Sequence, residues 1–286
     1  MNKKKRSLSQ SRQTSEISRR DILVSGASMV LGSVAIGLPG FSYAQIASTD
    51  TREIKALTFD VFGTVVDWYT SVVREGEMLG RRKGIDIDWG AFALGWRSGY
   101  GPAMARVRNG ELPHMKIDDL HRLILDDLLE EFGIVGLSED EIVEFNRVWH
   151  RLIPWPDALK GLHRLKSRYL LATLSNGNMS LLTNMAKNGG LPWDVILSSE
   201  LTPGHFKIDR QVYEMAADLL DLDPAQIMMV AAHKVDLGGA RAVGFRTAYV
   251  NRPLELGPDR EKDTSPDDDA DINASDFLDL ANQLGA

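Results

Sequence analysis

The stretch FDVFGTVVDW, residues 59–68, is the part of the sequence that decides the fold. It follows a short apolar run of β type that begins at Ile54, and it places Asp60 directly after that run and Gly63 in the turn that comes next. In open sheets of parallel strands covered by helices, ligands bind beyond the carboxyl ends of the strands. The sequence therefore predicts that the Asp60 carboxylate lies where such a sheet binds its ligand.

The chain on the C-terminal side of residue 157 alternates between strand-like and helix-like segments. Strands are expected over 169–174, 195–197, 226–231 and 246–250, and helices over 179–188, 210–220, 237–243 and 277–284. This alternation is typical of an α/β fold, in which a parallel sheet is wrapped by helices. An acidic, proline-containing segment over 257–271 is expected to be a solvated loop.

The chain between Asp60 and residue 153 has a helical pattern instead. Apolar residues three and four positions apart predict helices over 71–82, 89–107, 117–132 and 138–150. Ser138 followed by Glu141 is a capping-box sequence at the start of the last of these. The sequence thus predicts a helical domain, residues 70–153, inserted into an α/β core formed by residues 45–69 and 154–286.

The first 44 residues are expected to be an export signal. The segment SRRDIL, residues 18–23, resembles a twin-arginine signal, and Ser42-Tyr43-Ala44 has the small-x-small form of a cleavage site. We expect recognition by the twin-arginine translocase, cleavage after Ala44 and a periplasmic location. An uncleaved membrane anchor is the alternative, and the glycines and the proline in the weakly apolar run 24–41 disfavour it.

The composition excludes several classes of function. The 286 residues carry a formal charge of −7, and the expected signal contains seven basic and two acidic residues, so the chain without it has a charge of −12. A chain this acidic is a poor binder of nucleic acid. Cysteine is absent, which excludes disulfides, thiolate metal sites and cysteine nucleophiles.

Polar side chains follow the apolar runs at four points of the sequence. Because the carboxyl ends of parallel strands meet at one edge of a sheet, these side chains are expected to converge on one site. Four such placements in the right order are much stronger evidence than one. The residues are Asp60 after the first run, Ser175 and Asn176 after the second, Lys207 after the third, and His233 with Asp236 after the fourth.

The quoted stretch resembles the first motif of the haloacid dehalogenase superfamily. In that superfamily the Asp at the position of Asp60 is a covalent nucleophile. Phosphatases of the superfamily carry a second Asp two residues later, which protonates an alkoxide leaving group, whereas this chain has Phe62 there. Halide leaves without a proton, so the pair Asp60 and Phe62 favours carbon–halogen bonds over phosphate esters.

Further motifs narrow the resemblance to the type II, L-2-haloacid dehalogenases. They are LGWRSGY from residue 94, LSNGN from residue 174, FKIDRQVYEMA from residue 206 and MVAAHKVDLGGAR from residue 229. The resemblance extends over about residues 54–281. It implies a Rossmann-like parallel-sheet core with a helical cap inserted after the first strand.

The resemblance also implies roles for individual residues. Asp60 is the nucleophile and Thr64 orients it, while Arg97 receives the substrate carboxylate or the leaving halide. The expected catalytic residues are Asp60, Thr64, Lys207, His233 and Asp236, and the expected substrate-binding residues are Phe62, Arg97, Ser175, Asn176 and Tyr213.

Two positions depart from the family pattern. Lys207 is usually followed by proline, and this chain has Ile208. Many members have Ser and Asn in the fourth motif, where this chain has Ala231, Ala232 and His233. His233 is expected either to act as the base for an ester-hydrolysing water or only to hydrogen-bond the pocket, and the sequence does not decide between the two.

The sequence therefore predicts hydrolytic dehalogenation of small (S)-2-haloalkanoic acids to 2-hydroxy acids through an ester on Asp60, without a metal or an organic cofactor. The alternative is a Mg²⁺-dependent phosphatase of the same superfamily, with Asp236 as a metal ligand. A non-enzymatic periplasmic binding protein that retains the fold is a rival of another class. Homodimers are common in the resembled family, but nothing in this sequence establishes one.

Overall fold

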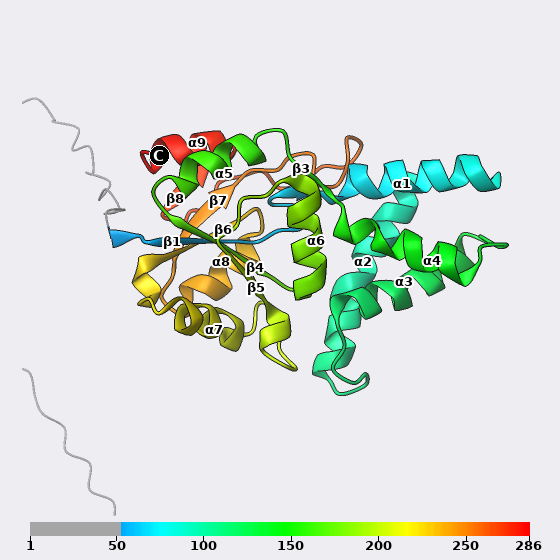
Figure 1. Ribbon diagram of the computed structural model, residues 1–286, viewed down its shortest axis with the longest axis horizontal. Coiled ribbons are helices and arrows are strands. Elements are labelled where there is room, and N and C mark those ends of the chain that lie inside the picture. Colours follow the sequence, from blue (N-terminus) through cyan, green and yellow to red (C-terminus); the bar gives the residue numbers. More distant parts are fainter. Residues whose placement is uncertain (1–52) are drawn as a thin grey trace, which may run out of the picture. The chain divides into compact units, whose positions relative to one another are not determined.

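Figure 1 shows the computed structural model of the chain, which describes residues 53–286. The predicted export signal and its cleavage site lie outside the described residues. Within residues 53–286, no helix is both long enough and apolar enough to cross a membrane.

A sheet of six parallel strands forms the centre of the α/β part and confirms the predicted fold class. Its strand order is β5-β4-β1-β6-β7-β8, so the strand that precedes Asp60 lies between the strands that precede Ser175 and His233. The strands are β1 (Ala56–Phe59), β4 (Leu170–Ser175), β5 (Val195–Ser198), β6 (Ile227–Ala231), β7 (Arg246–Val250) and β8 (Ile272–Ala274).

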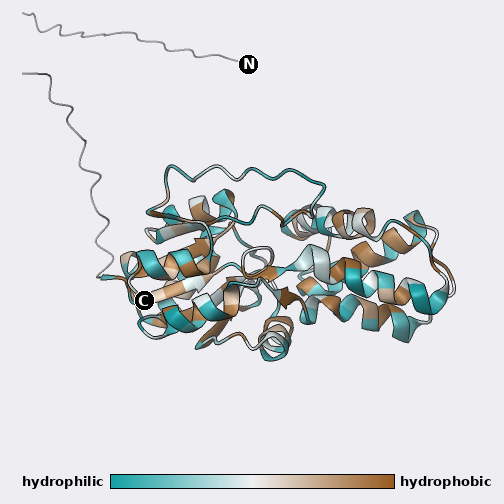
Figure 2. Ribbon diagram, turned by 90° about the horizontal axis from the view of Figure 1, so that it is seen from above, coloured by the Kyte–Doolittle hydropathy of each residue, from teal (hydrophilic) through white to brown (hydrophobic). Residues whose placement is uncertain are grey.

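Helices cover both faces of this sheet. Successive side chains of a strand point to opposite faces, and accordingly Leu57 and Phe59 of β1 pack in one apolar cluster while Met229 and Ala231 of β6 pack in another. The first cluster includes α5 (Ala158–Lys166), α6 (Met179–Gly189) and α9 (Phe277–Gln283), and the second includes α7 (Arg210–Leu220) and α8 (Lys234–Arg241). Figure 2 shows the resulting pattern, with apolar residues in the strands and on one side of many helices.

A helical segment separates β1 from the rest of the sheet along the chain. It comprises α1 (Trp68–Lys83), α2 (Trp89–Arg108), α3 (Ile117–Glu131), α4 (Glu139–Asn146) and the short 3₁₀ helix η2 (Arg147–His150). The helices start where polar caps permit: Asp67 caps α1, Asp88 caps α2, and the predicted capping box of Ser138 and Glu141 is present at α4. This segment supplies the residues that face the carboxyl ends of the strands.

Some elements were not predicted. Two short strands flank the helical segment and pair with each other in an antiparallel ribbon, β2 (Val66–Asp67) with β3 (Ile153–Pro154). Helix α5 was also not predicted, and neither was strand β8, because a strand of three residues is too short to show a clear period. The segment 257–271 has no helix or strand, as expected, but it is not only solvated, since Asp267 is buried.

Candidate active site

The predicted site residues converge at the carboxyl ends of β1, β4 and β6. All of them except Thr64 and Tyr213 line a cavity of about 180 Å³, to which α2 contributes Arg97 and Tyr100. The cavity is lined by Asp60, Phe62, Arg97, Tyr100, Ser175, Asn176, Lys207, Ile208, His233, Val235 and Asp236. We refer to it below as the active-site cavity.

Asp60 lies at the base of this cavity and is 7% exposed. Its Oδ1 accepts a hydrogen bond from Lys207 Nζ at 2.9 Å, and its Oδ2 accepts bonds from Thr64 Oγ1 at 2.7 Å and His233 Nδ1 at 2.9 Å. Burial by itself would raise the pKa of Asp60, but the Lys207 ammonium and the His233 ring outweigh it and hold that pKa well below its usual range. Asp60 is therefore an oriented, poorly hydrated carboxylate.

Lys207 carries the positive charge nearest to Asp60. Its Nζ also donates to Asp236 Oδ2 at 2.5 Å, and Asp236 Oδ1 in turn accepts from the Tyr213 hydroxyl at 2.6 Å. Burial would lower the pKa of Lys207, but the two carboxylates raise it, so the ammonium persists. Tyr213 is fully buried and does not line the cavity, so the expected contact with substrate is replaced by a positioning contact with Asp236.

Ser175 and Asn176 line the active-site cavity at the carboxyl end of β4. Asn176 Oδ1 accepts a hydrogen bond from the backbone N–H of Lys207 at 2.7 Å. This bond fixes the backbone position from which the Lys207 side chain extends. Ser175 Oγ accepts from the backbone N–H of Gly177 at 3.3 Å. Phe62 is 5% exposed and forms an apolar wall, packed edge-on against Trp149 with 6.0 Å between ring centroids.

Arg97 approaches the cavity from α2. Its guanidinium carbon lies 4.7 Å from the ring centroid of Tyr100 and 5.9 Å from that of Trp68. Within the part of the chain that the structure describes, no carboxylate lies within ion-pair distance of Arg97, so its charge is available to an anion. Tyr100 was not singled out from the sequence; burial raises its pKa to about 12, and it faces the cavity as a neutral phenol.

His233 is held between two carboxylates. Its Nδ1 contacts Asp60 Oδ2 and its Nε2 contacts Glu255 Oε1 at 2.8 Å. Carboxylates only accept hydrogen bonds, so both ring nitrogens must carry protons. Burial would lower the pKa of His233, but the bonds to Asp60 and Glu255 raise it to about 9. His233 is therefore an imidazolium beside the free Asp60 carboxylate, and in that state it is not a base.

Glu255 is a second residue of the site, after Tyr100, that was not predicted from the sequence. It lies in the loop after β7, is 3% exposed, and accepts from Lys262 Nζ at 2.5 Å. Burial would raise the pKa of Glu255, but His233 and Lys262 lower it to about 2. The rule that ligand-site residues follow parallel strands also applies to β7, and it could have identified Glu255.

The donor set does not suit a divalent cation. Lys207 Nζ lies between the carboxylates of Asp60 and Asp236, and it supplies the charge there that a metal ion would supply. Within residues 53–286, no cluster of three or more His, Asp or Glu side chains is arranged to hold a metal ion.

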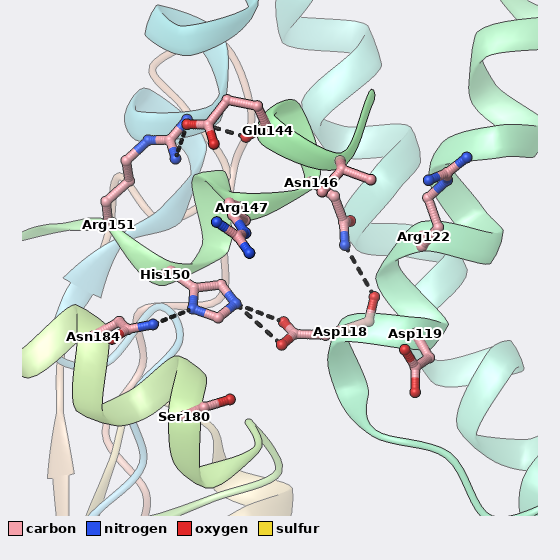
Figure 3. Close-up of a pocket in the computed structure, with 11 residues that line it drawn as sticks. Asp118, Asp119, Arg122, Glu144, Asn146, Arg147, His150, Arg151, Ser180 and Asn184 are labelled. Carbon is pink, nitrogen blue, oxygen red and sulfur yellow. Dashed lines mark hydrogen bonds and ion pairs between the residues drawn. The ribbon is translucent and has the colours of Figure 1, made fainter. Parts of the chain in front are cut away.

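A larger cavity, about 680 Å³, lies between α3, η2 and α6 and does not include Asp60 (Figure 3). In it His150 Nε2 donates to Asp118 Oδ1 at 3.0 Å, and Asn184 Nδ2 donates to His150 Nδ1 at 2.9 Å. Arg151 pairs with Glu144 in the same view. These contacts join the helical segment to α6, and nothing in them marks a reacting group.

Comparisons with known proteins agree with this geometry. A family model described as haloacid dehalogenase-like hydrolase matches residues 54–244. The (S)-2-haloacid dehalogenase of Pseudomonas sp. (strain YL) is 31% identical over 205 residues, which cover 70% of this chain and 83% of that protein. (S)-2-haloacid dehalogenase 1 of Pseudomonas sp. (strain CBS-3) is 28% identical over 216 residues, with 70% and 85% covered.

Two crystal structures are similar throughout the described α/β and helical parts. That of the L-2-haloacid dehalogenase PA0810 has a TM-score of 0.78 and 47% sequence identity, and the match covers 81% of this chain and 99% of that chain. That of the defluorinating L-2-haloacid dehalogenase Rha0230 has a TM-score of 0.79 and 43% identity, with 82% and 96% covered.

Proposed function

The chain belongs to the family of haloacid dehalogenase-like hydrolases, and from this premise we propose that it hydrolyses the carbon–halogen bond of small (S)-2-haloalkanoic acids to give 2-hydroxy acids. The observation that carries this function is a buried, ionised Asp60 that faces an apolar wall at Phe62 instead of a second carboxylic acid. Relatives and solved structures named as (S)-2- or L-2-haloacid dehalogenases support it.

In the first step an Asp60 oxygen attacks the carbon that bears the halogen. A carbon–oxygen bond forms, the carbon–halogen bond breaks, and halide leaves with the electron pair, so the carbon centre inverts. Water strongly solvates a free carboxylate, whereas Asp60 is 7% exposed and is held in place by Thr64 and Lys207. The free charge of Arg97 and its planar donor fork suit the substrate carboxylate or the departing halide.

In the second step water attacks the carbonyl carbon of the Asp60 ester, the bond from that carbon to the product oxygen breaks, and the 2-hydroxy acid leaves with the proton that the water gives up through His233. The remaining proton of the new Asp60 carboxyl group passes to His233, which restores both the carboxylate and the imidazolium. Esterification removes the negative charge of Asp60, so one of the two groups that keep His233 protonated is lost. The ring can then release a proton to solvent, since its side chain is 31% exposed, and its Nδ1 lies beside the ester. We propose that His233 takes the proton from water only in this step, with Glu255 holding the other ring nitrogen.

The phosphatase alternative is not favoured. Phe62 cannot protonate an alkoxide, and Lys207 occupies the space between Asp60 and Asp236 that a Mg²⁺ ion would need. We therefore expect dehalogenation to persist in EDTA and p-nitrophenyl phosphate to be a poor substrate. Strong Mg²⁺-dependent phosphatase activity would reverse this preference.

The same proposal includes export to the periplasm by the twin-arginine translocase. It rests on the sequence of residues 18–23 and 42–44 alone. Replacing Arg19 and Arg20 by Lys should retain the precursor in the cytoplasm, and the exported form should begin at Gln45. Unchanged export of the double-lysine variant would disprove the route. A homodimer is proposed only from the resemblance, and light scattering of the purified protein would test it.

The direct test of the activity is halide release from (S)-2-chloro-, 2-bromo- and 2-fluoropropionate and from the corresponding haloacetates. The product of the propionates should be (R)-lactate. Asp60→Asn is the matched control, because it keeps the size of the side chain and removes the nucleophile. Absence of halide release from every acid by a folded wild-type protein would refute the proposed function.

A further inference from the structure

A second cavity, about 430 Å³ in volume, adjoins the active-site cavity and has no role in the chemistry described above. We call it the outer cavity. It is formed by the start of α1, one face of α2 and the loop that follows β7, which is coloured orange in Figure 1. Its lining consists of Trp68, Ala91, Leu94, Gly95, Arg97, Ser98, Leu256 and Arg260.

Arg97 belongs to the lining of both cavities. Its guanidinium group lies between Tyr100, which lines the active-site cavity, and Trp68, which lines the outer one. Stacking on two aromatic rings holds the group in place without neutralising it. Because the Arg97 guanidinium group lines both cavities, an anion in either cavity can contact it.

Arg260 is the second cation of the outer cavity. It is exposed, as are Ala91 and Ser98, so the cavity opens to solvent. As with Arg97, no carboxylate among residues 53–286 forms an ion pair with Arg260, whereas most of the charged residues around the larger cavity of Figure 3 are paired. No acidic side chain lines the outer cavity.

These features are unusual for this chain, which is acidic as a whole. Asp259 and Glu261 flank Arg260 in the sequence, but among residues 53–286 the only charged side chains in the lining are the two cations. A lining of one sign raises the local concentration of small ions of the opposite sign. The substrate is a small monoanion, and so is the halide product. Both must cross the protein surface in every catalytic cycle.

We infer that the outer cavity is an approach site for small monoanions, in which Arg260 attracts the anion at the mouth and Arg97 passes it to or from the active-site cavity. This inference rests on the proposed function. It assigns Arg260 a role in the movement of anions to or from the active site, although Arg260 does not touch the reacting atoms. The same chemistry serves two anions, the entering haloacid and the departing halide, and kinetics can distinguish them.

The test compares Arg260→Gln, Arg260→Glu and Arg260→Lys with Arg74→Gln and Arg74→Glu in the full-length protein. Arg74 is an exposed α1 arginine without an ion pair in the described part of the chain, and it lines none of these cavities. At low ionic strength kcat/KM for (S)-2-chloropropionate should fall by about two- to threefold in the Gln variant and about five- to tenfold in the Glu variant. The Lys variant should resemble the wild type, and kcat should be unchanged.

Added sodium sulfate should reduce these differences, because the Debye length falls from about 10 Å at 0.1 M ionic strength to about 3 Å at 1 M. A salt-sensitive loss of kcat/KM assigns the site to substrate entry. A weakened inhibition by chloride with unchanged kcat/KM assigns it to halide release. Equal effects at Arg260 and Arg74, or a loss of kcat that Lys does not restore, would overturn the inference. Wild-type halide release, measured first, separates this outcome from failure of the proposed function.

Discussion

His233 Nε2 and Glu255 Oε1 lie 2.8 Å apart, so a residue from the loop after β7 holds the ring that follows β6. The other side of that ring contacts Asp60. A carboxylate behind an imidazole fixes its orientation and stabilises its protonated form, as in the Ser-His-Asp arrangement. Here the group on the far side of the ring is itself a nucleophile, and its charge disappears when it reacts.

Glu255→Gln should slow ester hydrolysis and leave the first displacement nearly intact. Gln keeps the shape of Glu255 but removes the charge that keeps His233 in place, and we expect a loss of about 10²-fold in the second step. Burst-phase halide release followed by slow turnover would show it. Glu261→Gln is the control, because Glu261 is exposed in the same loop and forms no side-chain hydrogen bond among the described residues. Equal turnover by both variants would remove Glu255 from the mechanism.

Gly63 shows why Glu255 can reach this position. Gly63 has φ +82°, and a Cβ built there would lie 2.1 Å from Glu255 Oε1. Gly63→Ala should therefore destabilise the protein by about 1–3 kcal/mol, from backbone strain and from displacement of the carboxylate. Urea unfolding measures the loss.

The matched control for that variant is Gly110→Ala. Gly110 has φ +74° but nothing within 4 Å of the added Cβ, so it reports the backbone strain alone. In the background of Glu255→Ala, Gly63→Ala should cost no more than Gly110→Ala, because the clash is gone. Additive effects of Gly63→Ala and Glu255→Ala would mean that the two residues do not compete for the same space.

Much of this site follows from the order of elements along the chain. Asp60, Asn176, Lys207 and Asp236 each come after a parallel strand, and parallel strands place their ends together whatever the loops do. Tyr100 could not be found in the same way, because its position depends on how helix α2 packs over the sheet, whereas Glu255 follows β7 and falls under the same rule. The state of His233 also needed the structure, since its charge depends on Glu255.

The fold was predictable to a similar degree. Long amphipathic helices such as α2 and α7 begin at the predicted residues, because burial of one face sets their period. Helix α8 begins at Lys234, three residues before the prediction, since its first turn carries the site residue Asp236 on a short polar stretch. Short elements such as β2 and β8 are formed by pairing with distant strands, which no local pattern contains.

The stability of the protein should depend on pH through His233. Its pKa rises from 6.5 to about 9 in the folded state, so the folded state binds a proton that the unfolded state has released. The contribution is therefore fully present below about pH 6.5 and is lost as the pH rises through about 9. Solvent screens a side chain that is 31% exposed, so we expect about 1–2 kcal/mol.

Urea unfolding of the wild type and of His233→Asn at pH 6 and pH 10 measures this contribution. The difference in the free energy of unfolding between the two proteins should shrink by that amount between the two pH values. A difference that stays constant or grows would show that His233 is not the protonated partner of Asp60 and Glu255.

The covalent role of Asp60 predicts a specific isotope pattern. In a single turnover with excess enzyme in ¹⁸O-water, the hydroxy acid should be unlabelled, because its oxygen comes from Asp60. Water then attacks the ester carbonyl, so mass spectrometry of the peptide that contains Asp60 should show the label. Label found directly in the product would mean that water attacks the carbon and that Asp60 acts as a base.

The last prediction concerns the step in which His233 acts. Asn can still donate a hydrogen bond to Asp60, so His233→Asn should leave the first displacement nearly intact. If His233 takes the proton from water, hydrolysis of the ester should slow by about 10²- to 10⁴-fold. The protein should then accumulate a covalent adduct, visible by intact mass after rapid quench, and the added mass should be that of the 1-carboxyalkyl group of the substrate in place of the proton of the Asp60 carboxyl.

Arg74→Gln is a suitable control for that experiment, because its side chain is exposed on α1 and lines none of the cavities described here. If His233 only forms hydrogen bonds within the pocket, the Asn variant should change the range of accepted acids and the KM without trapping an adduct. The experiment distinguishes the two roles because they act at different steps. A base is needed only after the ester has formed and the charge of Asp60 is lost. A residue that only contacts the substrate affects binding, before the ester forms. Normal turnover without an adduct would exclude the base role.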